Sequence, residues 1–137
     1  MSTAIPMRFV SNRSMMQLIY KQPFLDWLRS VDPQPFVETV DELKEDNDSY
    51  LIPDFDDPAD AVKWVEMRWQ FLFDSILLEW LTDESLWPQK RTLKMFRSWF
   101  DIQIHSMLWD LSEEPILTES FEEDLWVDYE VSDGLLH

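Results

Sequence analysis

The sequence predicts an α+β fold: a single domain, residues 1–137, with a small three-stranded mixed or parallel sheet and four packed helices. The length of 137 residues is that of one domain. Apolar residues recur at helical spacing in four segments: residues 23–31, 36–45, 58–81 and 87–99. Shorter apolar runs suit strands at residues 14–20, 49–53 and 100–111. Because long helical connections separate these runs, we expect mixed or parallel pairing.

The first half begins with an irregular N-terminus, residues 1–13, followed by the strand at 14–20. Pro23 then stands where proline suits the first turn of a helix. The buried stripe of this helix is marked by i, i+3, i+4 and i+7 spacing at Phe24, Trp27, Leu28 and Val31. A second helix is expected at 36–45, and Pro53 ends the next strand.

A long central helix, about 58–81, is the most informative pattern in the chain. Asp57 is suited to the N-cap, with Pro58 at the first helical position and Asp60 in the first turn. One apolar stripe contains Ala61, Val62, Val65, Trp69, Leu72, Phe73, Ile76 and Trp80. A second, separate group contains Trp64, Met67, Phe71 and Leu78. The first stripe would meet the sheet, whereas the second needs another helix, the tail or another subunit to cover it.

The second half continues with a helix at about 87–99, opened by Trp87 and Pro88. Residues 100–111 then favour a strand, because polar and apolar side chains alternate through its first half. The tail, 112–137, contains nine acids and no base. We expect it either to form a short helix after Thr118 or to be flexible until it packs.

Composition excludes several kinds of site. The single glycine, Gly134, lies in the tail, so no glycine-rich phosphate loop can form. The absence of cysteine excludes disulfides, thiolate nucleophiles and iron–sulfur clusters. With only His105 and His137, a zinc site built on several histidines is also excluded. We therefore expect no cofactor and no metal.

The net charge of −17 restricts the partners of the chain. Direct nucleic-acid binding is not expected, because that affinity comes mainly from Lys and Arg. An anionic membrane surface would repel the chain, and no segment approaches the length needed to span a bilayer. No targeting segment is visible in the sequence, so a cytoplasmic location is expected.

The acids are segregated along the sequence. Residues 32–60 contain eleven acids and one lysine, a net charge of −10. One interpretation is a solvated surface, and the other is a docking face for a basic partner. Asp54, Asp56 and Asp57 are the acids most suited to such a face. A metal site there fails the EF-hand pattern, since the glycine and the final glutamate are missing.

His105 is the weak catalytic candidate. A Ser–His–Asp triad with the adjacent Ser106 is geometrically poor, because neighbouring strand residues point to opposite faces. We expect His105 to be hydrogen-bonded within a packed sheet. The alternative is general acid–base catalysis with a carboxylate, since histidine titrates near neutral pH.

Four of the eleven basic residues lie close together in the sequence. They are Lys90, Arg91, Lys94 and Arg97. On an acidic protein this cluster suggests an anion-binding site. The alternative, which we favour, is internal pairing with the acidic segment 32–60 or with the acidic tail.

Function is expected to lie in contacts with other proteins. The leading hypothesis is a protein–protein interaction module that binds a protein partner or itself. Its surface would combine Asp54, Asp56 and Asp57 with the second helical group, Trp64, Met67, Phe71 and Leu78. A sharper version is an acidic inhibitor or immunity-type protein that masks a basic nucleic-acid enzyme. The third hypothesis is a small hydrolase or isomerase that uses His105 with a carboxylate.

Over roughly residues 14–111, the spacing of several short motifs resembles small bacterial proteins of uncharacterised function. The motifs are Tyr50-Leu-Ile-Pro-Asp with the Trp-rich helix after it, Leu86-Trp-Pro, Trp99-Phe-Asp and His105-Ser-Met-Leu-Trp-Asp. This resemblance implies no activity.

Overall fold

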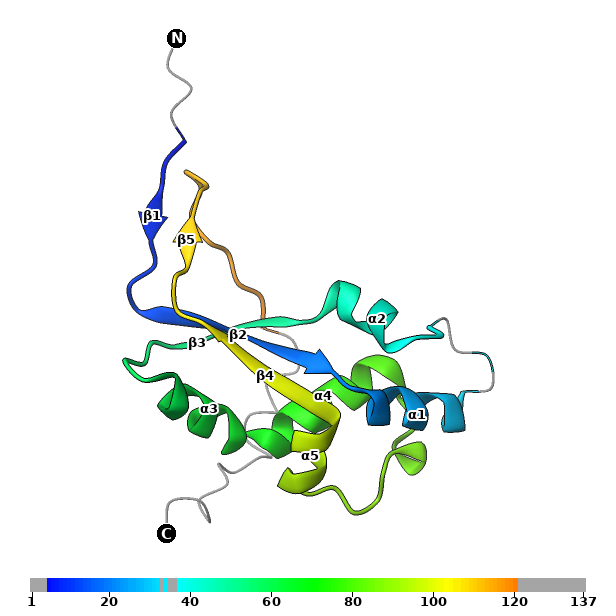
Figure 1. Cartoon of the computed structure of the whole chain (residues 1–137). Coiled ribbons are helices and arrows are strands. Elements are labelled where there is room, and N and C mark those ends of the chain that lie inside the picture. Colours follow the sequence, from blue (N-terminus) through cyan, green and yellow to red (C-terminus); the bar gives the residue numbers. More distant parts are fainter. Residues whose placement is uncertain (1–4, 33, 35–36, 121–137) are drawn as a thin grey trace.

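The structure is a computed structural model that describes residues 5–32, 34 and 37–120 (Figure 1). It is a mixed α+β fold in which helices pack against a small antiparallel sheet. The predicted fold class is therefore confirmed at this level. Within the described ranges, none of the helices combines the length and the apolar character needed to cross a bilayer.

The sheet has three strands in the order β3-β2-β4. The central strand β2 (Arg13–Tyr20) pairs with β3 (Ser49–Pro53) and with β4 (Phe100–His105). Both pairings are antiparallel, and Gln17 of β2 lies opposite a residue of each neighbour. The predicted mixed or parallel pairing of neighbouring strands is therefore wrong.

The connections explain the antiparallel arrangement. Helices α1 (Gln22–Val31) and α2 (Val40–Leu43) lie between β2 and β3. The chain leaves β2 and enters β3 at the same end of the sheet, so this long connection serves as a hairpin loop. The segment from β3 to β4 instead crosses to the opposite end. β3 and β4 thus run in the same direction, but β2 separates them.

The helices of the first half follow the predicted pattern in part. Helix α1 agrees with the predicted helix at 23–31, and it buries Phe24, Leu25, Trp27 and Leu28. In place of the predicted helix at 36–45, the structure has the single turn α2 and the 3-10 helix η1 (Lys44–Asp46). The helix begins late because the Thr39 side chain accepts a hydrogen bond from the Glu42 amide, which makes Thr39 the N-cap.

The predicted single helix at 58–81 is wrong, because it is broken into α3 (Pro58–Glu66) and α4 (Trp69–Trp80). At the break, the Arg68 amide bonds to the Val65 carbonyl, and the Arg68 ψ angle of 19° departs from helical geometry. The break gives each helix its own buried face. Leu77 lies outside the apolar stripe predicted for one continuous helix, yet its side chain is fully buried in α4.

The helix predicted at 87–99 begins later than expected. Helix α5 (Leu93–Trp99) is preceded by the 3-10 helix η2 (Glu84–Leu86). The Thr92 hydroxyl oxygen accepts a hydrogen bond from the Met95 amide at 3.1 Å, so Thr92 is the N-cap. Trp87 instead packs into the core, where its indole donates to the Leu81 carbonyl.

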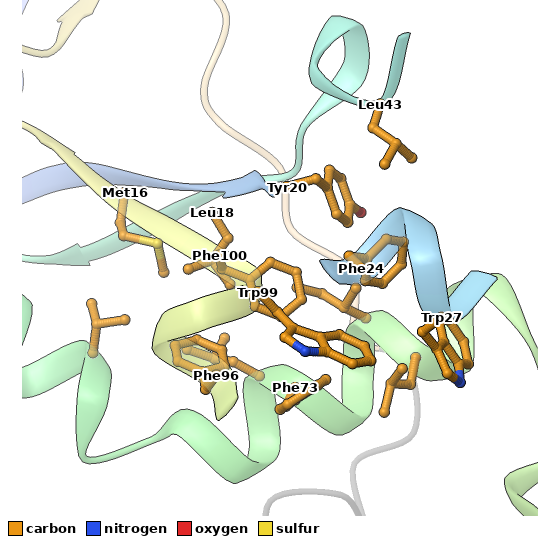
Figure 2. Packing of buried hydrophobic residues seen from close by; sticks show 14 of the residues in the cluster. Met16, Leu18, Tyr20, Phe24, Trp27, Leu43, Phe73, Phe96, Trp99 and Phe100 are labelled. Carbon is orange, nitrogen blue, oxygen red and sulfur yellow. The ribbon is translucent and has the colours of Figure 1, made fainter. Parts of the chain in front are cut away.

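The core lies between the sheet and the helices (Figure 2). Alternate residues of β2 point into it, and these are Ser14, Met16, Leu18 and Tyr20. The Phe24 ring, fully buried, lies 4.7 Å from the Tyr20 ring and 5.8 Å from the Phe100 ring, measured between centroids. This aromatic packing joins α1 to two strands of the sheet.

A second, two-stranded sheet lies beyond one end of the first. The expected strand at 100–111 is interrupted after β4, and β5 (Trp109–Asp110) pairs antiparallel with β1 (Arg8–Phe9). The N-terminal segment 1–13 is thus not wholly irregular. Of the acidic tail, residues 112–120 are exposed and contain no helix or strand, and the rest lies outside the described residues.

Candidate functional site

The two-stranded sheet of β1 and β5, here called the ribbon, continues β2 and β4 past an irregular junction (Figure 1). Five residues separate Phe9 from Met15, but only three separate their partners Trp109 and His105. One strand therefore has two more residues than the other across the junction. Extra residues of this kind bend a strand pair. The ribbon accordingly projects away from the helix-covered sheet.

One face of the ribbon is apolar. Phe9 and Trp109 are paired residues, so their side chains share a face, and their ring centroids are 5.3 Å apart in an edge-to-face arrangement. Their i±2 neighbours Met7, Met107 and Leu111 lie just outside the two strands, and continued alternation predicts them on the same face. We call this set the apolar ribbon face: Met7, Phe9, Met107, Trp109 and Leu111.

These side chains are exposed to solvent. Their exposed fractions are Met7 64%, Phe9 45%, Met107 66%, Trp109 46% and Leu111 53%. The described part of the chain has ten exposed large apolar side chains, and half of them belong to the ribbon face. Apolar residues exposed singly are ordinary, whereas a contiguous group marks an interaction site.

The opposite face of the ribbon holds it together. The Arg8 guanidinium lies 3.4 Å from an Asp110 carboxylate oxygen and also donates to the Ser112 carbonyl. Val10 and Leu108 are half-buried, and the Val10 amide donates to the Leu108 carbonyl at 2.8 Å. Polar contacts and backbone pairing thus order the two strands, which leaves the apolar side chains free to make other contacts.

The predicted acids lie in the loop after β3. Ser14 donates a hydrogen bond to the Asp54 carboxylate at 2.9 Å, and Asp57 accepts one from the Ala59 amide, so it is the predicted N-cap of α3. Asp56 is exposed, as are the other two. The Asp54 and Asp57 carboxylates fix the loop through these hydrogen bonds, while all three side chains are exposed to solvent.

The second apolar group of the central helix is largely covered by the chain itself. Trp64, Phe71 and Leu78 are half-buried against the core, and Met67 is half-buried at the break between α3 and α4. The Arg68 guanidinium lies 3.6 Å from the centroid of the Trp64 ring. The structure therefore assigns most of this group to packing within the chain.

The four basic residues fall into two groups, two arginines that form ion pairs and two exposed lysines. Arg91 lies 2.8 Å from the buried Asp74 carboxylate, and Arg97 makes two hydrogen bonds to Glu66, at 2.6 and 2.9 Å. Lys90 and Lys94 are exposed. Internal pairing thus occurs for the two arginines, and among the described residues their partners are acids of α3 and α4 rather than of segment 32–60 or of the tail as far as residue 120.

His105 lies at the end of β4, opposite Met15, and faces solvent. The expectation of a histidine packed inside the sheet is wrong, because residues 101, 103 and 105 all lie on the outer face. A surface hollow of about 220 Å³ lies elsewhere, and it is lined by Val62, Glu66, Arg97, Phe100, Asp101 and Ile102. Among the described residues, no three His, Asp or Glu side chains form a group that could hold a metal ion.

A carboxyl pair joins α4 to the segment before β3. Loss of solvent, a hydrogen bond with Asp48 and the charge of Asp48 raise the pKa of Glu79 to about 7. Burial also raises the pKa of the neighbouring Tyr50 phenol, which therefore stays neutral. Sequence reasoning missed this pair, because 30 residues separate the two acids and no motif connects them.

The ribbon face was missed for a different reason. The odd-numbered apolar residues are visible in the sequence, as Met7 and Phe9 in one segment and Met107, Trp109 and Leu111 in the other. The pairing of two segments about 100 residues apart is what makes them one surface. Alternation of apolar residues at 7–9 and at 107–111 is the available signal, but the sequence predicts one strand over 100–111.

Comparison with protein-family models, with curated proteins and with solved structures found no match for this chain. Its function must therefore be argued from the residues and their geometry.

Proposed function

We propose that this chain is a protein–protein interaction module that binds its partner through the apolar ribbon face. The observation that carries the proposal is the exposed pair of Phe9 and Trp109 rings on two short strands, flanked in the sequence by three more exposed apolar side chains. Water around such a cluster is released on binding, and this release stabilises a complex. Trp109 is the expected centre of the interface, because tryptophan is the residue most enriched among binding hot spots.

The expected partner-binding residues take different parts in this proposal. Asp54, Asp56 and Asp57 remain candidates, since their charges face solvent. Trp64, Phe71 and Leu78 contribute to the core instead, so the ribbon face replaces them as the apolar part of the surface. The acidic inhibitor or immunity-type function is a narrower form of the same proposal.

The enzyme alternative has less support. It needs His105 to line a pocket together with a carboxylate, which would bring the imidazole within reach of a substrate. His105 instead lies on the outer face of β4, and the hollow beside Arg97 is lined by other residues.

The test is affinity capture with the full chain and with a variant that carries Phe9→Ser and Trp109→Ser. Proteins captured only by the unchanged chain are identified and purified, and their dissociation constants are measured by calorimetry. We expect the double variant to bind at least about tenfold more weakly, as removal of a hot spot costs about 2 kcal/mol or more. Circular dichroism checks that the variant is folded.

The matched control is Leu51→Ser, which removes an apolar side chain of similar exposure, 53%, from β3. This variant should keep the affinity of the unchanged chain. If the purified partner bound the ribbon variant as tightly as the unchanged chain, the ribbon face would not be its binding site and the proposal would fail.

A further inference from the structure

We infer that the partner is a basic protein whose apolar side chains lie within a positively charged surface, and that the ribbon and the acidic loop bind it together. This inference rests on the proposed function and adds the chemistry of the partner. It depends on where the loop that contains Asp54, Asp56 and Asp57 lies relative to the ribbon.

The loop and the ribbon lie at the same end of the sheet. Arg13 begins β2, just after the ribbon strand β1, and it is paired with Pro53, the last residue of β3. The acidic loop begins at the next residue, Asp54, which the hydrogen bond from Ser14 ties to β2. In Figure 1 the turn after β3 and the base of the ribbon are accordingly found at one end of the molecule. One partner could therefore contact both.

The charges at this end are mainly negative. The exposed acids of the loop, of the first turn of α3 and of the segment after β5 are Asp54, Asp56, Asp57, Asp60, Glu113 and Glu114. Two bases, Arg8 and Arg13, belong to the same region, and Arg8 is already paired with Asp110. An apolar face bordered by an excess of carboxylates matches a basic partner with apolar side chains at its centre.

The whole-chain charge favours the same choice of occupant. A second copy of this chain would also carry a net charge of −17, so the two copies would repel each other as they approached. A basic protein would be attracted instead, which raises the rate of association at low salt. We therefore assign the face to a basic protein and not to a second copy.

The two parts of the surface should affect binding differently. Apolar contacts that are buried in the complex mainly determine how slowly it dissociates, whereas charges at the rim mainly determine how fast it forms. Removal of the loop charges should therefore lower the association rate and the salt dependence. Removal of the Trp109 side chain should raise the dissociation rate.

The experiment uses two synthetic peptides and the isotope-labelled full chain, observed by NMR. One peptide alternates Lys and Arg with Leu and Phe, and in the matched peptide Glu replaces every base. We expect the basic peptide alone to shift the amide signals of the ribbon and of residues 54–60. Its affinity should fall about tenfold or more between low and physiological salt.

The charge variant is Asp54→Asn, Asp56→Asn and Asp57→Asn in one chain. Asparagine is a good N-cap and also accepts a hydrogen bond from serine, so the loop should keep its structure. We expect this variant to bind the basic peptide about tenfold more weakly and to lose most of the salt dependence. The Leu51→Ser variant should bind as the unchanged chain does.

Several outcomes would overturn the inference. Equal binding of both peptides, or of neither, would show that the face does not select a basic partner. A doubling of mass that Trp109→Ser abolishes would assign the face to a second copy. Nuclear Overhauser contacts between Trp109 and residues 121–137 would assign it to the chain's own C-terminal segment. If the two peptides bound equally, or neither bound, and a partner captured through the ribbon proved to be acidic or neutral, the inference would fail but the proposed function would stand. The failure of the inference and the failure of the proposed function are therefore distinguishable.

Discussion

Two phenylalanines in different regions of this chain make similar ring contacts but have different environments. Phe73 of α4 lies 5.2 Å from the Trp99 ring and 5.5 Å from the Phe100 ring, and it is fully buried. Phe9 of the ribbon lies 5.3 Å from the Trp109 ring, yet 45% of it is exposed. The contribution of an aromatic residue to folding depends mainly on the area that it removes from water.

The comparison separates two uses of apolar residues. In the core, the rings of α1, α4, α5 and β4 pack against one another and exclude water. In the ribbon, the paired strands order the rings, but no described element covers their outer side, as the exposure of Trp109 shows. The first arrangement stabilises the fold, and the second leaves apolar area that a partner can bury.

The largest expected effect comes from Phe73→Ala. Truncation of a fully buried phenylalanine leaves a cavity and should lower the free energy of unfolding by about 3–5 kcal/mol. Phe9→Ala should cost about 1 kcal/mol or less, which is the worth of an edge-to-face pair at an exposed site. Urea unfolding followed by circular dichroism measures both values. Equal losses would show that the ribbon belongs to the folding core.

Much of the first half could be predicted from the sequence, because its signals are local. Pro23 and the i, i+3, i+4 pattern of Phe24, Trp27 and Leu28 indicate α1, and short apolar runs indicate β2 and β3. These patterns depend on neighbours within about one turn or one strand. They therefore hold without knowledge of the tertiary structure.

The errors arose where distant contacts decide the structure. The break at Arg68 separates two helices whose buried faces differ, which one continuous periodicity cannot represent. The relative direction of β2 and β3 depends on whether α1 and α2 return the chain to the end of the sheet that it left. The length of the connection alone does not show this. The ribbon depended on the pairing of Phe9 with Trp109, far away in the sequence.

The candidate site was predicted only in part for the same reason. Asp57 was identified as a cap from its local context, and it is one. The role of Asp54 required its contact with Ser14, 40 residues earlier. The sequence predicts pairing with acids for the cluster Lys90, Arg91, Lys94 and Arg97, but the acids that Arg91 and Arg97 reach, Asp74 and Glu66, depend on how α5 and the segment before it pack near α3 and α4.

A second comparison concerns these two ion pairs. Asp74→Asn should lower the free energy of unfolding by about 3 kcal/mol, because it leaves the Arg91 charge in a poorly solvated site. Glu66→Gln should cost less than about 1 kcal/mol, since the Arg97 side chain is 55% exposed and its charge is solvated. Urea unfolding midpoints with unchanged slopes would measure the difference. If Glu66→Gln were the more damaging change, burial would not be what ranks the two pairs.

The last expected effect is the pH dependence at Glu79 of α4. The pKa of this carboxyl is raised from 4.5 to about 7 in the folded chain. Between these values the folded state holds the proton more firmly than the unfolded state does, so this group makes stability fall as pH rises from 4.5 toward 7. Above that window its effect is constant.

Glu79→Gln removes this titration. Its melting temperature, compared with that of the unchanged chain, should therefore show an advantage that grows from about pH 5 to about pH 8. Asp48→Asn keeps Glu79 but removes the neighbouring charge, so the slope due to Glu79 should decrease without disappearing, because loss of solvent remains the largest cause of the raised pKa. Parallel pH profiles for Glu79→Gln and the unchanged chain would contradict the raised pKa. Parallel profiles would also show that the carboxyl pair of Asp48 and Glu79 does not make the stability of the chain depend on pH.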